Sequence, residues 1–336
     1  MTMPEAAISK DSETLLELSF TLREDTIWSE AGFEVACIQV PLNSLSALKK
    51  PEAQNEVRVS IEKTTSSVKV TGGRNFWTLS LSPGAISSWK KDNVELIAQP
   101  LLPSFFRAPP DNDFPQDGKD WLDRKLQFGS VHTRGIEFKE NEDGTANITL
   151  SQKFGPKVLS WSLDLSTTLT FSPSGSLDFH VTRKPASQAL PKTLPRIGVT
   201  LGLPAAFQTT EWFGRGPISQ ISDLWAAPEF PQECSNRTDT HWFMISNGEG
   251  AGLTAQFYKP SNKAQRQLFD FMASHYDVKN IFDSKHPYEL EGEKKEHVIL
   301  RLDAEHHGLG TGSCGPKTLD EYALKAATFE FGLVLY

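Results

Sequence analysis

Two acidic residues in one turn are the first candidates for chemistry in this sequence. Asp111 and Asp113 flank Asn112 in a run that begins Arg107-Ala108-Pro109-Pro110. Carboxylates two residues apart could hold a divalent cation, as in glycosyltransferases. The spacing is common by chance, however, and the α/β nucleotide domain of such enzymes is not visible. We therefore favour a structural role over direct contact with a ligand. In this role the segment is a rigid turn capped by its own side chains, with Arg107 bridging a carboxylate.

Histidine and cysteine offer a second route to chemistry. Glu305, His306 and His307 could move protons, but neighbouring residues of a strand point to opposite faces, so we expect them not to converge. Cys314 has no neighbouring base that would activate it as a nucleophile. The eight histidines and three cysteines show no zinc spacing. The sequence thus predicts no metal site and no catalytic residue.

Strands must position these residues, because apolar side chains alternate with polar ones along most of the chain. Seven runs show this period of two, namely Val57/Val59/Ile61, Trp77/Leu79/Leu81, Trp161/Leu163/Leu165 with Leu169/Phe171, Leu177/Phe179/Val181, Ile197/Val199/Leu201, Val298/Leu300/Leu302 and Phe329/Phe331/Leu333/Leu335. Turn residues separate them, which is typical of an antiparallel sandwich. A short helix is predicted over Asp117 to Gln127, packing Trp121, Leu122 and Leu126.

The N-terminal part has a different organisation. Residues 1–14 are predicted to be a flexible terminus, and residues 43–56 a polar linker. Between them, residues 15–42 predict two strands joined around Trp28 to Gly32. Two strands alone are marginal in water. They must dock on the large sandwich or pair with strands from elsewhere.

Charge and cysteine use narrow the class of partner. The 336 residues carry a formal net charge of -8, which argues against nucleic acid and anionic membranes. Three distant cysteines favour a reducing compartment, so we expect a cytoplasmic protein. The first residues, Met1 to Ser12, contain no apolar segment, and no run approaches the ~18 apolar residues of a membrane span.

Three motifs in fixed order carry a family resemblance. Phe106 to Asp113, Phe213 to Pro217 and Gly308 to Pro316 resemble the closing domain of glycoside hydrolase family 2 β-galactosidases, and the small subunit of heteromeric β-galactosidases. The similarity runs from about Leu15 to Tyr336. It implies a mainly β fold: residues 57–336 form a large antiparallel supersandwich of the galactose-mutarotase-like type. Residues 15–42 are similar to the end of a preceding immunoglobulin-like β-sandwich.

The resemblance also implies what this chain lacks. Retaining glycosidases need two carboxyl groups about 5 Å apart, and no spacing here singles out a pair. In the family these groups lie on a (β/α)8 barrel, which takes roughly 250 residues of alternating strand and helix and is not visible here. The implied function is that of a C-terminal portion or small subunit, inactive alone, which completes the active-site rim and the oligomer of an enzyme acting on galactose-containing sugars. Its partner is a barrel-bearing chain or upstream domains, where the family's Mg and Na also bind.

Two segments are implied to face substrate. In the family a mobile loop follows the first motif, and here it maps onto Phe114 and a lid formed by Pro115, Gln116, Asp117, Gly118 and Lys119, with Gly118 as hinge. Some relatives carry a sugar-stacking tryptophan at the position of Cys314. Cysteine offers a smaller surface, and a buried turn residue is the alternative reading. The implied substrate-binding residues are Asp113, Phe114, Ser313 and Cys314.

Other motif residues are implied to be structural. Arg107, Asp111 and Asn112 fix the first loop, and Arg215, Asp223 and Arg237 fix loops or interdomain contacts. The chain departs from the family at Ser219-Gln220-Ile221, where Glu-Asn-Tyr is common, and at Cys234, where Asn is usual. These departures leave a free-standing carbohydrate-binding module as an alternative function. An aldose mutarotase, suggested by fold kinship, ranks last. Three tryptophans, Trp212, Trp225 and Trp242, are interpreted as core rather than as a sugar groove.

Overall fold

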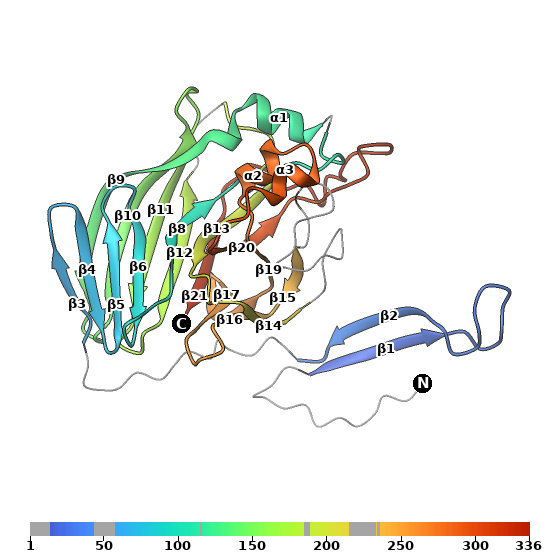
Figure 1. The fold of residues 1–336 in the computed structure, drawn as a ribbon, viewed down its shortest axis with the longest axis horizontal. Coiled ribbons are helices and arrows are strands. Elements are labelled where there is room, and N and C mark those ends of the chain that lie inside the picture. Colours follow the sequence, from blue (N-terminus) through green and yellow to red (C-terminus); the bar gives the residue numbers. More distant parts are fainter. Residues whose placement is uncertain (1–13, 44–57, 115, 185–188, 215–232, 234–235) are drawn as a thin grey trace.

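Two large β-sheets and a separate hairpin make up the protein (Figure 1). The computed structural model describes residues 14–43, 58–114, 116–184, 189–214, 233 and 236–336. The predicted flexible terminus and linker fall almost entirely outside these ranges, as do Pro115, Arg215, Asp223 and Cys234. Every strand pair within them that belongs to the two sheets is antiparallel. The predicted mainly β, antiparallel fold is confirmed.

The first sheet has nine strands in the described chain. In spatial order they are β14 (Thr209–Phe213), β16 (Trp242–Ser246), β17 (Gly252–Lys259), β21 (Glu330–Leu335), β12 (Leu177–Lys184), β11 (Leu163–Phe171), β10 (Ala146–Pro156) and β9 (Gly129–Glu140), with β18 (Asn262–Gln267) paired to β17. Along β11, buried and half-buried residues alternate without a break. The period of two therefore places one face of this sheet in the core. The last strand, β21, lies in the middle of the sheet, between β17 and β12.

The second sheet has ten described strands. They are β15 (Arg237–Thr240), β19 (Phe269–Ser274), β20 (Val298–His306), β13 (Arg196–Leu203), β8 (Gln99–Ser104), β6 (Ala85–Lys91), β5 (Asn75–Ser80), β4 (Ser67–Gly72) and β3 (Ser60–Lys63), with β7 (Val94–Glu95) paired to β6. The strand β20 is buried on both faces over its first seven residues, unlike β11. Its outer face must therefore be covered.

Aromatic rings join the two sheets across the core. Trp77 of β5 meets Phe171 of β11 at a ring-centroid distance of 5.1 Å. At the other end, Phe243 of β16 and Phe271 of β19 are 4.3 Å apart. Such pairs combine large apolar burial with favourable ring geometry. The sheets thus form one sandwich with a continuous core.

Three short helices gather at one end of the sandwich (Figure 1). They are α1 (Asp117–Asp123), α2 (Val278–Asp283) and α3 (Pro287–Glu291), and a 3-10 turn, η1 (Leu126–Phe128), follows α1. The helix predicted to Gln127 ends earlier, because Lys125 adopts φ 59°, a left-handed conformation that breaks the helical path. Ile281 of α2 and Leu290 of α3 pack with Met272 and Tyr276 over the outer face of the ten-stranded sheet.

The N-terminal hairpin lies apart from the sandwich (Figure 1). It consists of β1 (Leu15–Thr21) and β2 (Glu34–Pro41), paired antiparallel. Every residue of β2 is exposed, and Phe20 and Ile38 are 54% and 52% exposed. A hairpin this apolar and this open has no core of its own.

Candidate functional site

Two loops that are distant in sequence meet at one place on the surface. Ser313 Oγ donates a hydrogen bond to Asn112 Oδ1 at 2.6 Å, across 201 positions of the chain. Gly312 allows this approach, since a Cβ atom there would lie 2.4 Å from the carbonyl oxygen of Asn112. We call residues 111–114 and 308–316 the paired loops. Phe114 and Cys314 are both exposed on them, so the structure brings together the residues implied to bind substrate.

Asp113 supports the paired loops from beneath. Its side chain is buried and accepts hydrogen bonds from Arg107 Nη1 at 2.6 Å and Nη2 at 3.1 Å, while Arg107 itself is fully buried. Its backbone N–H closes the turn onto Pro110 O at 2.9 Å. Burial raises the pKa of the Asp113 carboxyl to about 6, and Arg107 acts in the opposite direction. Asp111, two residues earlier, is exposed.

The described residues of the segment implied to be a lid, Gln116 to Lys119, form the N-cap and first turn of α1. Gly118 is buried in the first turn, and its N–H donates to Asp113 O at 3.0 Å. Asp117 is half-buried and accepts a hydrogen bond from Thr193 Oγ1 at 2.9 Å. Gln116 and Lys119 are exposed. The helix is therefore docked directly against the Arg107–Asp113 pair.

A buried histidine, which the sequence offered only as a candidate for proton transfer, links α1 to the second loop. His307 Nδ1 accepts a hydrogen bond from Leu324 N at 3.1 Å, which leaves the proton on Nε2, 3.6 Å from Asp117 Oδ2. The carbonyl oxygen of His307 lies 3.4 Å from Arg107 Nη2. Trp121 packs edge-on against the imidazole at 5.2 Å. One cluster thus holds α1 and both paired loops.

This histidine predicts a specific pH dependence of stability. Burial lowers the pKa of His307 to about 4 from its ordinary value of 6.5, although Asp117 raises it. A depressed histidine pKa gives stability that is present above about 6.5 and is lost as the pH falls toward 4. The raised pKa of Asp113 has the opposite sign, with stability lost as the pH rises from 3.8 to about 6.

We therefore expect the pH dependence due to His307 to show in the difference in unfolding free energy between wild type and a His307→Asn variant. The contribution of Asp113 largely cancels in this difference. The wild-type advantage should shrink by up to about 1.4 kcal/mol per pH unit between pH 6.5 and pH 4. Urea denaturation across this range measures it. A difference that does not change with pH would show that His307 is not held neutral.

Glu305 and His306 lie next to each other at the end of β20. Both line a pocket of about 370 Å³ with Glu321 and Tyr322. A bulge precedes them in β20, where Glu305 pairs with Ile197 but Asp303 pairs with the next residue, Gly198. Burial lowers the pKa of His306 well below its ordinary value, so the ring is neutral.

A second ion cluster lies inside the molecule. Arg196 Nε donates to Asp303 Oδ1 at 2.8 Å, and a second contact joins Arg196 Nη2 to Asp303 Oδ2. Arg301 Nη1 contacts both oxygens of Glu233 at 2.8 and 3.0 Å, and Arg196 Nη1 is 3.7 Å from Glu233 Oε1. Glu233 belongs to the motif before Arg237, and its contacts with Arg301 hold the Glu233 side chain in this cluster. Arg237 itself is buried, with its guanidinium 5.3 Å from the Trp212 ring.

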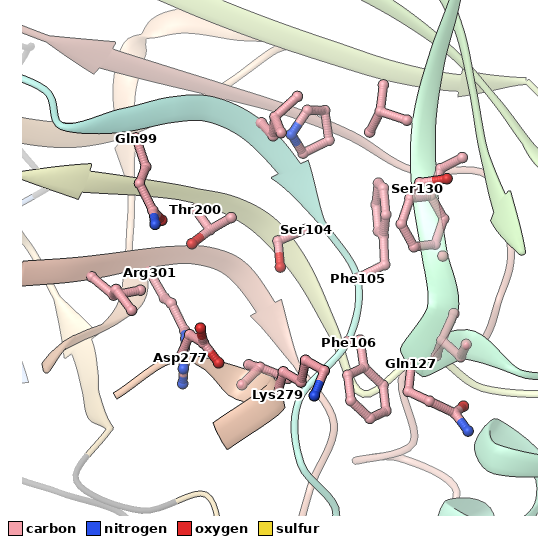
Figure 2. A pocket seen from close by; sticks show the side chains of 18 of the residues that line it. Gln99, Ser104, Phe105, Phe106, Gln127, Ser130, Thr200, Asp277, Lys279 and Arg301 are labelled. Atoms are coloured by element: carbon pink, nitrogen blue, oxygen red, sulfur yellow. The ribbon is translucent and has the colours of Figure 1, made fainter. Parts of the chain in front are cut away.

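A pocket of about 480 Å³ opens on the outer face of the ten-stranded sheet (Figure 2). Strands β8, β13 and β20 contribute to it, together with α2 and the start of β9. None of the residues implied to bind substrate lines it. Within the part of the chain that the structure describes, no three His, Cys, Asp or Glu side chains come together as a metal site requires. No helix in these residues is long and apolar enough to cross a membrane.

Two sequence profiles of β-galactosidase regions match this chain. The sequence profile described as beta galactosidase small chain matches residues 71–219 and 218–335, and that of beta-galactosidase domain 4 matches residues 1–43. The β-galactosidase of Kluyveromyces lactis is 27% identical over 98% of this chain and 32% of its own length. That of Psychromonas ingrahamii is 28% identical over 99% and 33%. The chain thus spans about a third of these curated relatives.

Among solved structures, the fold is similar to a putative aldose 1-epimerase from Escherichia coli K12. The identity is 12%, with a TM-score of 0.44, covering 82% of this chain and 98% of that one. A galactose 1-epimerase from Lactobacillus acidophilus matches with 6% identity and a TM-score of 0.36, covering 84% of this chain and 98% of that one.

Proposed function

The chain belongs to the β-galactosidase small-chain family, and we propose that it is the non-catalytic portion of a β-galactosidase that completes the rim of the active site. The observation that carries this proposal is the contact between Asn112 and Ser313. It fixes two exposed loops, with Phe114 and Cys314, on one surface. The bond-breaking carboxylates come from a barrel-bearing chain or from upstream domains.

The hairpin supports a partner of this kind. Its apolar side chains, among them Phe20 and Ile38, are exposed on a two-stranded sheet that cannot exclude water alone. Burying them against further strands would remove a large apolar area from water. We propose that β1 and β2 complete the immunoglobulin-like sandwich of the assembled enzyme, and that this junction also contributes to its oligomer.

Exposed thiols favour the cytoplasm. Cys37 and Cys314 are both free and exposed in the described chain. Such thiols survive unpaired in a reducing compartment, where disulfides are rare. We propose a cytoplasmic location.

Reconstitution tests the proposed function. The purified chain alone is expected not to hydrolyse an aryl β-galactoside. Adding a Kluyveromyces lactis β-galactosidase fragment that lacks the third matched by this chain should restore turnover. Activity no greater than that of the fragment alone would overturn the proposal. Sugar binding without restored activity would instead favour a free carbohydrate-binding module, and accelerated loss of optical rotation of fresh α-galactose would favour a mutarotase.

The rim role makes a finer prediction in the reconstituted enzyme. Ser313→Ala removes the hydrogen bond to Asn112, which contributes about 1 kcal/mol, so kcat/KM should fall about fivefold. The fall should come mainly from a higher KM, since the loops position substrate rather than react. Lys317→Ala, an exposed change in the segment that follows the second loop, is the matched control. Equal kcat/KM values for both variants would show that the paired loops do not form part of the rim.

A further inference from the structure

The floor of the pocket in Figure 2 is the outer face of three neighbouring strands. Thr200 of β13 lies between Leu102 of β8 and Arg301 of β20 in the strand register. The alternate residues Val199 and Leu300 are buried in the sandwich core. The side chains of this cross-strand row therefore point away from the core and into the pocket.

A glycine makes room on this floor. Gly202 pairs with Gln99 on one side and Ile299 on the other. A Cβ atom on Gly202 would lie 2.6 Å from Cβ of Gln99, so Gln99 lies across the bare backbone of β13. Figure 2 shows the Gln99 amide and the Thr200 hydroxyl on the same side of the pocket. The floor of the pocket is thus a recess in the sheet, and loop residues such as Phe106 and Asp277 also line the pocket.

The walls are largely apolar. Phe105, Phe106 and Phe154 line the pocket, together with Val278 of α2. The volume of about 480 Å³ falls within the range of about 300–1,000 Å³ typical of small-molecule sites. Such sites combine apolar walls with a few polar groups that orient the ligand.

The charged residues of the lining already have partners. Arg301 is held by Glu233 and by the carbonyl oxygen of Tyr276 at 3.2 Å. Asp277 caps α2 by accepting from Asn280 N at 2.8 Å, and Lys279 pairs with Asp283. Both cations of the lining are thus paired with carboxylates, and the Asp277 carboxylate is engaged at the start of α2.

Neutral hydrogen-bonding groups remain for a ligand. The side chains of Gln99 and Ser104 make no hydrogen bond to any described residue, and the Thr200 hydroxyl has only a long contact of 3.4 Å to Leu300 O. An amide and two hydroxyls beside apolar walls match a molecule with several hydroxyl groups and an apolar C–H face. A pyranose has both features.

We propose that this pocket binds a neutral saccharide, one or two pyranose units in size, through Gln99, Ser104 and Thr200. No residue of the paired loops lines the pocket, so this site is distinct from the proposed rim. It would hold a sugar on the outer face of the sandwich whether or not the barrel-bearing partner is present.

Isothermal titration of the whole chain tests this site, with methyl β-galactopyranoside and methyl β-glucopyranoside as probes. We expect saturable binding of at least one probe in the millimolar range. Thr200→Val and Ser104→Ala should each raise its Kd about three- to tenfold, as the loss of one ligand hydrogen bond does. Thr149→Val is the matched control, because Thr149 is a half-buried threonine on the outer face of the other sheet.

Three results would overturn the proposal. The first is no saturation by either probe at tens of millimolar sugar. The second is binding that Thr200→Val and Ser104→Ala leave unchanged in proteins with wild-type unfolding curves. The third is binding that Ser313→Ala abolishes while the two pocket variants retain it, which would place the sugar at the paired loops and support the rim instead. Failed reconstitution, by contrast, leaves the pocket titration untouched.

Discussion

Replacing Asp303 by asparagine is expected to lower the free energy of unfolding by about 3–5 kcal/mol, because it leaves the buried Arg196 without its paired carboxylate. Arg196 and Asp303 are both 0% exposed, and their contacts are bidentate. Asparagine keeps the volume but removes the negative charge. The nearest remaining carboxylate, that of Glu233, is 3.7 Å from Arg196 Nη1 and is already bound by Arg301. Urea denaturation at pH 7 measures the loss.

The double variant Arg196→Met/Asp303→Leu separates charge from packing. Apolar side chains of similar volume often replace a buried ion pair at little cost, so this variant should be more stable than Asp303→Asn. Lys119→Ala provides the control, since its pair with Asp123 is exposed and should contribute under about 1 kcal/mol. A loss below about 1 kcal/mol for Asp303→Asn would show that water or another group solvates Arg196.

Asp113→Asn is expected to lower the free energy of unfolding by about 3–5 kcal/mol and to disturb the proposed rim as well. Arg107 is fully buried, and Asp113 provides its two short hydrogen bonds to a carboxylate. The same turn holds Asn112 against Ser313, and α1 begins on the backbone of Asp113. Loss of the pair should therefore loosen both paired loops, and the reconstituted enzyme should lose more kcat/KM than with Ser313→Ala.

The matched control lies two residues away. Asp111→Asn makes the same chemical change in the same turn, but Asp111 is exposed. It should change the free energy of unfolding by less than about 0.5 kcal/mol. Equal effects of the two variants on stability and activity would mean that the turn, rather than the buried pair, determines the result.

Alternation along the chain predicted the sandwich because each strand must bury one face. β11 follows this rule over its whole length. The rule was incomplete for β20, where Val298 and Leu300 were expected to be buried but Ile299 and Arg301 are buried too. The helices α2 and α3 come before β20 in sequence and cover the outer face of its sheet, and no local pattern in the strand encodes that cover.

The candidate site was predictable only in part. The residues implied by the resemblance do include both members of the Asn112–Ser313 contact. The contact itself was not predictable, because the two residues lie 201 positions apart in the chain. The position of His307 was missed because its partners, Leu324 and Asp117, come from two other segments. The bulge in β20 before Glu305 was not predictable either, because hydrophobic periodicity does not encode a backbone irregularity of this kind.

The central position of β21 has a consequence for biosynthesis. Residues 330–335 insert between β17 and β12, which precede them by more than seventy positions. The nine-stranded sheet therefore cannot close before residues 330–335 have been synthesised and have left the ribosome. Deleting this strand would leave β17 and β12 with unpaired edges inside the sheet, and edges of that kind promote aggregation.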